Sequence, residues 1–357
     1  MRVYLQSILG AVGALPPTTL DLVDPERRLG LYVSVDAETF RAQIQAAGSL
    51  ASFTGQSDRS FAMGPLLPTA PVQLKSKKNI EATLLSSGQL NSVATPQTFG
   101  QLLTECKPEL ALIPNPVLLP RDLTHTPLKW ASLYQHSKAL SYWVENLHAP
   151  ETTLAVGVSM DLVAEYPDQP KKELQEGCFA DIKAASAIFT PYPHDLRHLR
   201  ERFGTSRLVA ACGPGLASLL RALSDGATDV ITNLVADYAE RGIAITLPLS
   251  IGSTTAEPPL KQESEAKPDS WCCRVYLSEY SRAKGPLLNG CPCDACKRPL
   301  AYLRHLYATH ELTGRLLLCI HNTTWLVRLL VTLEERPPNE RAVLLRTLLE
   351  AIMAQNE

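Results

Sequence analysis

Three cysteines fall within six residues of this chain, at Cys291, Cys293 and Cys296. Thiolates spaced as Cys-x-Cys-x2-Cys can wrap one face of a zinc ion, which takes four nitrogen or sulfur ligands in a tetrahedron. A histidine on a downstream helix can close the fourth position and fasten the loop to that helix. Three thiolates and one imidazole leave no position for a reactive water, so the sequence predicts one structural zinc ion.

The stretch after the cysteines offers three candidates for the fourth ligand: His305, His310 and His321.

Nine cysteines in a long chain without a secretory signal favour metal ligation in a reducing compartment over a disulfide framework, so we expect a cytoplasmic protein. The other six are scattered, and lone cysteines are usually small buried hydrophobic residues. We assign no role to Cys106, Cys178, Cys212, Cys272, Cys273 and Cys319.

Composition and charge narrow the class of protein. The 357 residues are 45% hydrophobic, which allows a large core. The net charge of -2, from 34 Lys and Arg against 36 Asp and Glu, excludes nucleic-acid binding by bulk charge alone. No run approaches the roughly 20 apolar residues that a spanning helix needs, so no transmembrane segment is expected. Residues 1–15 make a poor signal peptide, and we interpret them as a first strand and loop.

Short apolar or β-branched runs alternate with helical stretches along the chain. This alternation predicts parallel strands joined by crossover helices. We therefore predict an α/β fold with a (β/α)8 TIM-like barrel, and an open doubly wound sheet is the alternative. The predicted strands are Leu31–Val35, Leu110–Ile113, Leu154–Val158, Ala187–Phe189, Leu208–Ala211, Thr228–Ile231 and Ile243–Leu249.

Three regions are predicted along the chain. Residues 1–251 form the main part of the barrel, and residues 271–357 form a zinc-binding subdomain with the C-terminal barrel helices. Residues 252–270 read GSTTAEPPLKQESEAKPDS, a composition that cannot bury enough apolar surface to order itself, so we predict a flexible polar insertion. In the last helix, an apolar stripe at helical spacing predicts packing on the protein's own core: Leu344, Leu345, Leu348, Leu349 and Ile352.

Residues 291–322 resemble the zinc-binding segment of the tRNA-guanine transglycosylase family. The family's pattern is Cys-x-Cys-x2-Cys-x25-His followed by Asn, and here His321, followed by Asn322, stands 25 positions after the third cysteine. Arg298, the Ala-Tyr-Leu sequence that begins at Ala301, and Glu311-Leu312 also match. The resemblance implies a (β/α)8 barrel and a zinc ion held by Cys291, Cys293, Cys296 and His321. The close similarity covers about 130 residues, and the first 200 or so are less similar.

The same resemblance implies that the catalytic groups are missing. Residues 226–242 resemble the family strand whose aspartate attacks the ribose C1′. That position holds Ile231, or Thr232 if Asp229 is aligned instead, and neither side chain is a carboxylate. The family's proton-transfer acid has its nearest counterpart in residues 86–89, which read Ser-Ser-Gly-Gln. We therefore predict no catalytic residues and no bound cofactor other than zinc.

A chain of this kind is expected to be the non-catalytic half of a heterodimer. Its partner would be a catalytic queuine tRNA-ribosyltransferase subunit, and the pair would exchange guanine for queuine at position 34 of tRNAs with GUN anticodons. By resemblance, peripheral attachment to the mitochondrial outer membrane and homodimers without the partner are further expectations. Two alternatives stay open: an active transferase that uses Asp229 or Asp237, and a zinc-stabilised barrel that binds something other than tRNA.

Overall fold

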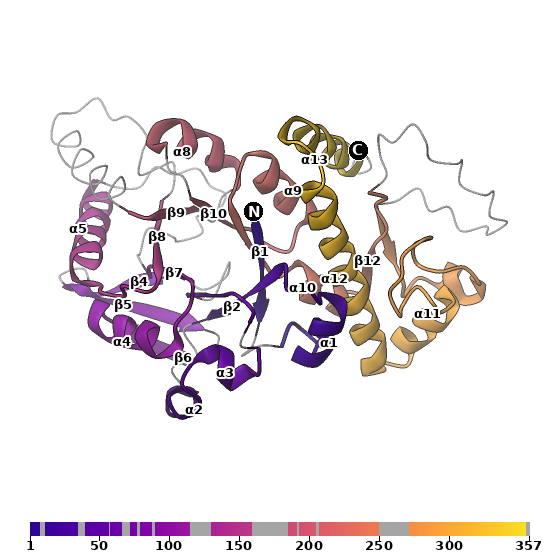
Figure 1. Ribbon diagram of the computed structural model, residues 1–357, viewed down its shortest axis with the longest axis horizontal. Coiled ribbons are helices and arrows are strands. Elements are labelled where there is room, and N and C mark those ends of the chain that lie inside the picture. Colours follow the sequence, from indigo (N-terminus) through magenta and orange to yellow (C-terminus); the bar gives the residue numbers. More distant parts are fainter. Residues whose placement is uncertain are drawn as a thin grey trace. The chain divides into compact units, whose positions relative to one another are not determined.

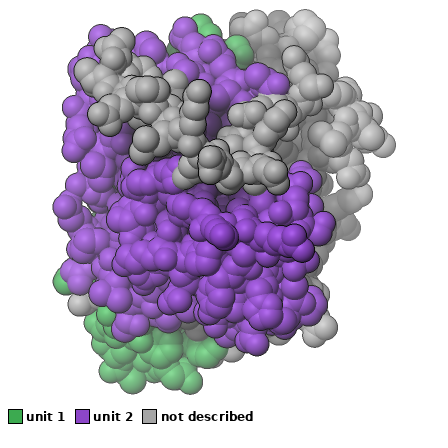
Figure 2. Space-filling view, turned by 90° about the vertical axis from the view of Figure 1, so that its right-hand side faces the viewer, with its two compact units in different colours: residues 1–9, 30–213, 225–232 green, residues 10–29, 214–224, 233–357 purple. Residues whose placement is uncertain are grey.

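The computed structural model describes residues 1–7, 11–34, 40–56, 58–65, 72–76, 79–87, 90–114, 130–158, 185–190, 193–204, 207–249 and 271–354. The chain forms two compact units, which are coloured separately in Figure 2. Unit 1 comprises Met1–Leu9, Gly30–Gly213 and Asp225–Thr232. Unit 2 comprises Gly10–Leu29, Pro214–Ser224 and Asn233–Glu357. The predicted insertion at 252–270 lies outside the described residues, and the predicted domain boundaries stay predictions.

Eight parallel strands close into a barrel in unit 1 (Figure 1). Around the barrel they follow chain order, and the last strand pairs with the first, as in Val3 beside Val230. The predicted barrel is confirmed, and the open sheet is wrong. The strands are β1 (Arg2–Ser7), β2 (Leu29–Ser34), β3 (Phe61–Gly64), β7 (Leu110–Leu112), β8 (Thr153–Gly157), β9 (Ala187–Thr190), β10 (Leu208–Ala211) and β11 (Asp229–Thr232).

The predicted set of barrel strands differs from the observed set at two places. The run from Ile243 is not a barrel strand, because β12 (Ile243–Ile245) pairs antiparallel with β13 (Cys272–Arg274) in unit 2. Strand β3 was not predicted, since its four residues end in a glycine and give little signal. That glycine is required: a Cβ at Gly64 would lie 2.6 Å from the Tyr32 hydroxyl and 2.8 Å from Leu112 Cβ.

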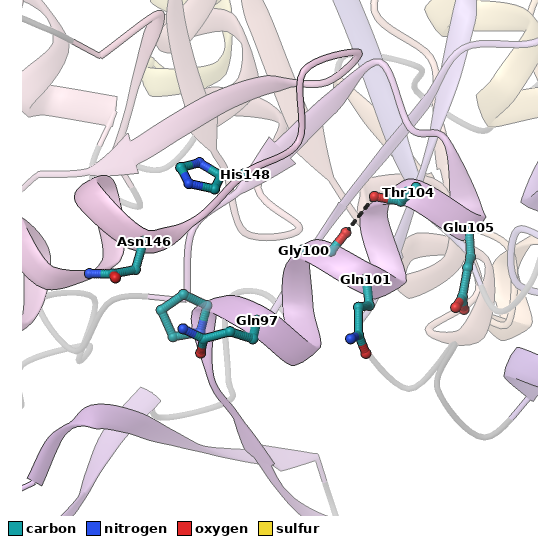
Figure 3. A pocket seen from close by; sticks show the side chains of 8 residues that line it. Gln97, Gly100, Gln101, Thr104, Glu105, Asn146 and His148 are labelled. Carbon is teal, nitrogen blue, oxygen red and sulfur yellow. Dashed lines mark hydrogen bonds between the residues drawn. The ribbon is translucent and has the colours of Figure 1, made fainter.

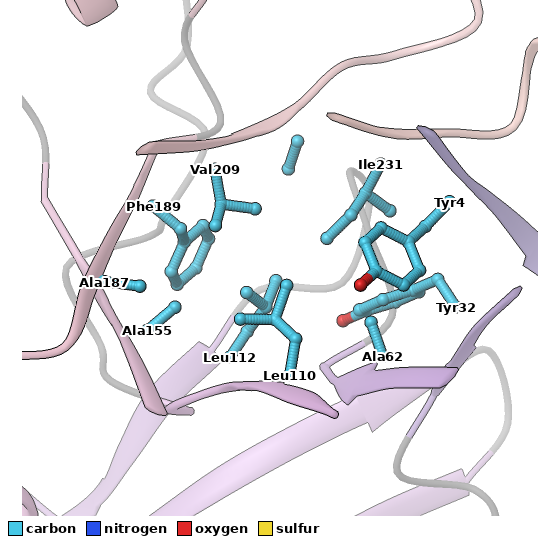
Figure 4. Close-up of a cluster of buried hydrophobic side chains, with 11 residues drawn as sticks. Tyr4, Tyr32, Ala62, Leu110, Leu112, Ala155, Ala187, Phe189, Val209 and Ile231 are labelled. Carbon is cyan, nitrogen blue, oxygen red and sulfur yellow. The ribbon is translucent and has the colours of Figure 1, made fainter. Parts of the chain in front are cut away.

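The barrel interior is filled with apolar side chains (Figure 4). Every second residue of a strand faces inward, and these residues pack as one buried cluster. Full burial of each large member contributes about 1.5–3 kcal/mol to folding. The cluster comprises Tyr4, Tyr32, Ala62, Leu110, Leu112, Ala155, Ala187, Phe189, Val209, Ala211 and Ile231.

A network of charges lies at the N-terminal ends of the barrel strands. Arg207, just before β10, donates from Nε to Asp229 Oδ2 at 2.9 Å and from Nη2 to Glu109 at 3.3 Å. Arg2 also forms an ion pair with Glu109. The Ser60 hydroxyl donates to Glu109 at 2.8 Å. These contacts join the starts of strands that lie far apart in sequence, and they satisfy the charges at this end of the barrel.

Helices and a small sheet complete unit 1. An antiparallel sheet of three strands, β4 (Val72–Ser76), β5 (Asn79–Ser87) and β6 (Leu90–Ala94), follows β3. Thr95 then caps α4 by accepting from Thr98 N at 3.2 Å, and Thr98 Oγ1 accepts from Thr95 N in return. The helices are α2 (Arg41–Ala47), α3 (Leu50–Thr54), α4 (Pro96–Cys106), α5 (Trp130–Asn146), the 3-10 turn η3 (Pro193–Asp195) and α8 (Leu196–Phe203).

Unit 2 is built around one long helix, α12 (Leu312–Glu334), which contacts α1, α10, α11 and β12. The last helix packs on α9, and its side chains Leu344, Leu345, Leu348 and Ile352 are buried, so the predicted core packing is confirmed. The other elements are α1 (Pro17–Val23), α9 (Leu216–Ser224), α10 (Leu234–Glu240), the 3-10 turn η4 (Ser278–Arg282), α11 (Leu300–Ala308) and α13 (Pro338–Met353).

Helix α12 is the one helix of the described residues that is long and apolar enough to cross a membrane by length and composition. Most of that stretch, 67%, is buried inside the protein. Its buried polar side chains His321 and Asn322 are hydrogen-bonded to the backbone of β12. Its burial and these hydrogen bonds are those of a helix in the protein core.

Candidate metal centre

The three cysteines lie in the turns before α11, and His321 lies in the middle of α12. Backbone turns shape the loop: Cys296 N donates to Cys293 O at 3.1 Å, and Cys291 N donates to Leu288 O at 3.3 Å. His321 Nδ1 lies 3.9 Å from the sulfur of Cys291, 3.5 Å from that of Cys293 and 3.3 Å from that of Cys296. All four ligand atoms lie within 4.8 Å of one another.

These separations suit a tetrahedral metal. With a metal–sulfur distance of about 2.3 Å and a metal–nitrogen distance of about 2.05 Å, tetrahedral geometry places sulfur and nitrogen about 3.6 Å apart. The observed distances of 3.3, 3.5 and 3.9 Å lie on both sides of that value. Three sulfurs and one imidazole nitrogen in this arrangement could hold a metal ion, and the donor set suits zinc.

Hydrogen bonding orients the imidazole for this role. His321 is fully buried, and its Nε2 lies 2.8 Å from the carbonyl oxygen of Ile245 in β12. Since a carbonyl can only accept, Nε2 carries the proton and donates it there. In the neutral ring, Nδ1 then keeps its lone pair, which points toward the three sulfurs. This is the pattern in which a ligand histidine is fixed by a partner on its other nitrogen.

Two further side chains of α12 bind β12 and the residues just after it. Asn322 Oδ1 accepts from Ile245 N at 2.9 Å, and its Nδ2 donates to Ile243 O at 3.0 Å. Trp325 Nε1 donates to Leu247 O at 2.7 Å. The opposite edge of β12 is paired with β13. The strand behind the histidine is therefore held on both edges, so the position of Nδ1 is fixed by the fold.

The three thiols shift one another's pKa values, because a negative charge on one sulfur disfavours ionisation of its neighbours. Contacts with Cys293 and Cys296 lower the pKa of Cys291 well below its usual value, while contacts with Cys291 and Cys293 raise the pKa of Cys296 well above it. Burial opposes the charged form of His321, but the neighbouring thiols outweigh it and raise the pKa of His321 to about 9. A bound cation would remove this competition between the sulfurs, because it would hold all three as thiolates.

The structure resolves which histidine joins the cysteines. His321 does, whereas His305 and His310 are exposed and are not part of the group. The part of Asn322 was not predicted, although its place directly after the histidine was part of the family pattern. Its contacts run to residues almost 80 positions earlier, which no local pattern shows.

Ile231 and Thr232, which the sequence resemblance offers as candidates for the nucleophile position, are both buried in the barrel strand β11. Ile231 is 1% exposed and belongs to the apolar cluster of Figure 4. Thr232 is buried, and its hydroxyl donates to Gly213 O at 3.2 Å. Of residues 86–89, the predicted counterpart of the proton-transfer acid, Gly88 and Gln89 lie outside the described residues.

The two aspartates that the sequence offers as alternative nucleophiles, Asp229 and Asp237, each form an ion pair with an arginine. Asp229 stands at the start of β11, where Arg207 and the Thr228 hydroxyl bind it. In barrels of this kind, active sites form at the opposite, C-terminal ends of the strands. Asp237 lies on α10 and forms an ion pair with Arg241 at 3.1 Å, one helical turn later. Both carboxylates are therefore paired with arginines in this structure.

A hollow of about 310 Å³ lies on unit 1 between α4 and the end of α5 (Figure 3). Gln97, Gln101 and Thr104 line it from α4, and His148 lies across from them. The carboxylate of Glu105 at its edge is bound by Arg41 at 2.6 Å, and this contact lowers the pKa of Glu105. No nucleophile paired with a base lines this hollow.

Comparison with known proteins finds similarity in the part of the chain that holds the candidate metal centre. Residues 206–336 match the family model described as "Queuine tRNA-ribosyltransferase", a range that contains all four candidate ligands. The chain is 53% identical over 49 residues to "Queuine tRNA-ribosyltransferase accessory subunit 2" of Drosophila grimshawi, 13% of this chain and 12% of that protein. The protein of the same name from Drosophila virilis is 58% identical over 38 residues, 10% of this chain and 9% of its own.

A bacterial relative matches a segment of similar length. It is the "Queuine tRNA-ribosyltransferase" of Herpetosiphon aurantiacus, 41% identical over 54 residues, which are 15% of this chain and 14% of that protein. These alignments span less than a sixth of each relative's length. The likeness to the family is therefore concentrated in short segments.

Proposed function

We propose that this chain, which carries a queuine tRNA-ribosyltransferase family domain over residues 206–336, is a non-catalytic subunit of such an enzyme. In this role it pairs with a catalytic subunit, and the pair exchanges guanine for queuine at position 34 of GUN-anticodon tRNAs. Three of the similar proteins carry the name accessory subunit 2, which supports this role. The bacterial relative carries the enzyme's own name, so the family alone does not decide the question.

One observation carries the non-catalytic role. Base exchange in this family needs a carboxylate that attacks the ribose C1′ and is later displaced. At the corresponding position stands Ile231 or Thr232, and neither is a carboxylate. Ile231 offers only a hydrocarbon side chain, buried in the cluster with Tyr4, Val209 and Ala211, and the Thr232 hydroxyl donates to Gly213 O. A buried apolar contact of this kind cannot supply a lone pair, and the aspartate two residues earlier is held by Arg207.

The metal centre has an architectural role in this proposal. Zinc bound by Cys291, Cys293, Cys296 and His321 would have four protein ligands and no open position, so it supplies cross-linking and no Lewis-acid chemistry. It would join the loop before α11 to the middle of α12. Through the bond from His321 to Ile245 O, it would also hold β12 in place.

Base exchange tests the proposal directly. Labelled guanine in a GUN-anticodon tRNA is exchanged by this chain alone, by a catalytic subunit alone, and by the two mixed. We expect exchange only with the mixture, and size-exclusion chromatography should show a one-to-one complex. Turnover by this chain alone would contradict the proposal and would make Asp229 and Asp237 the first residues to mutate.

A second function fits the same metal centre. A zinc-stabilised barrel can serve as a binding module without any part in tRNA modification, because a fold does not fix an activity. That reading predicts no complex with a catalytic subunit and no effect of this chain on exchange. The mixing experiment therefore separates the two.

A further inference from the structure

The three cysteines of the candidate metal centre are close enough to react with one another. Their sulfurs and the histidine nitrogen all lie within 4.8 Å of one another. Cys291 and Cys296 are half-buried, whereas Cys293 is only 7% exposed. Solvent therefore reaches two of the three cysteines, and a small oxidant can enter the cluster.

A tight turn brings Cys293 and Cys296 together. The backbone nitrogens of Cys296 and Lys297 both donate to Cys293 O, at 3.1 Å and 3.3 Å. In a turn of this kind the Cα atoms of the first and fourth residues lie less than about 7 Å apart, and disulfides span Cα separations of about 4.4–6.8 Å. This pair can therefore form a disulfide with little movement of the backbone.

The other cysteines of the described chain are poor competitors for an oxidant, because the thiolate is the reactive form. Burial raises the pKa of Cys106, Cys212 and Cys273 to about 12 and that of Cys319 to about 11, so these thiols stay protonated near neutral pH. Cys272 is half-buried, but it precedes Cys273 on strand β13, where successive side chains point to opposite faces. Oxidation should therefore be selective for the cluster.

We propose that the cysteine loop is a redox-sensitive switch, in which a peroxide converts Cys293 and Cys296 to a disulfide that can no longer hold zinc. The Cys296 thiolate attacks a peroxide oxygen, so an S–O bond forms, the O–O bond breaks and hydroxide leaves. The Cys293 thiolate then attacks the sulfenic sulfur, so the S–S bond forms, the S–O bond breaks and a second hydroxide leaves. The two sulfurs give up two electrons, which reduce the peroxide, and two protons from solvent convert both hydroxides to water.

The disulfide would undo the cross-link between the loop and α12. It leaves Cys291 and His321 as two donors, whereas a structural zinc ion takes four. His321 still donates to Ile245 O, so the contact between α12 and β12 does not depend on the switch. Because disulfide formation is reversible, a dithiol reductant and zinc would restore the cross-link. The inference rests on the metal centre and not on pairing with a catalytic subunit.

The test exposes the zinc-loaded full chain to hydrogen peroxide at neutral pH. A chromogenic chelator measures released zinc, and peptide mass spectrometry maps disulfides. We expect loss of one equivalent of zinc together with a disulfide between Cys293 and Cys296, both reversed by dithiothreitol and added zinc. The matched control Cys272→Ser should release zinc at the same peroxide concentrations as the wild type. Cys296→His keeps four nitrogen or sulfur donors but cannot form this disulfide, so it should retain its zinc.

Three results would overturn the inference. The first is retention of zinc by the wild type at peroxide concentrations that oxidise Cys272. The second is release of zinc without a disulfide between Cys293 and Cys296, and the third is equal release from Cys296→His. If Cys296→His binds no zinc before treatment, the wild-type disulfide map decides alone. None of these results bears on the proposed function, which the exchange experiment tests separately.

Discussion

Replacement of Asn322 by alanine should destabilise unit 2 strongly, although the residue binds no metal. Its side chain is fully buried and makes two hydrogen bonds to β12, at 2.9 Å to Ile245 N and at 3.0 Å to Ile243 O. Alanine leaves both backbone groups without a partner in a place that the surrounding core shields from water. Each unsatisfied buried group costs about 1–3 kcal/mol, so we expect a loss of about 2–6 kcal/mol.

The loss is measured by urea unfolding of zinc-saturated protein, followed by tryptophan fluorescence. Trp325 reports directly, since its indole nitrogen donates to Leu247 O just beyond β12. The matched control is Asn339→Ala on the exposed first turn of α13, which should change the stability by less than about 0.5 kcal/mol. Zinc affinity of Asn322→Ala should fall as well, because the carbonyl that orients His321 belongs to Ile245. A destabilisation below 1 kcal/mol with unchanged zinc affinity would refute this account of β12.

Three further predictions concern the metal ligands, the barrel end and acid stability. His321→Ala should abolish binding of one equivalent of zinc, measured by elemental analysis and chelator competition, whereas His305→Ala and His310→Ala should bind zinc as the wild type does; loss in either control would reassign the fourth ligand. Asp229→Asn should lower the unfolding free energy by about 1–3 kcal/mol, because it removes the charge that pairs with Arg207 in a largely buried place. The loss is limited because Arg207 still forms its ion pair with Glu109. Per folded heterodimer, exchange should stay at the wild-type rate, and a 100-fold loss would make Asp229 catalytic. The pKa of Glu105 is lowered by Arg41 from 4.5, so its contribution to stability is present above about pH 4.5 and is lost as the pH falls through the folded pKa. Glu105→Gln should therefore be less stable than the wild type at pH 7, with the difference shrinking toward pH 3 in unfolding titrations; a constant difference would contradict this.

The barrel and the metal cluster could be predicted because their signals are local. Strands such as Leu208–Ala211 are apolar on consecutive residues, as expected for strands covered on both faces. The three cysteines lie in one loop, and their spacing alone indicates a metal. Strand β3 reads Phe-Ala-Met-Gly, which has no β-branched residue and ends in glycine, so it gives little strand signal. The run from Ile243 looks like a barrel strand because it is apolar on consecutive residues.

Contacts between distant residues could not be predicted in the same way. The ion pairs that join Arg207 to Asp229 and Glu109 exist only because barrel closure brings the starts of separate strands together. From the sequence, Asp229 is a candidate nucleophile. In the structure it stands at the start of β11, where its ion pair with Arg207 joins two strands of the barrel. Likewise, the edge of β12 is bound by side chains of α12 from a distant part of the chain.

The most direct test of the non-catalytic role is to trap the covalent RNA intermediate in the heterodimer. The complex is incubated with GUN-anticodon tRNA and a base analogue that stalls release, and denaturing electrophoresis then shows which chain carries the RNA. We predict an adduct on the catalytic partner and none on this chain, because neither Ile231 nor Thr232, the two candidates for the nucleophile position, is a carboxylate. An adduct on this chain that disappears in Asp229→Ala or Asp237→Ala would contradict this prediction.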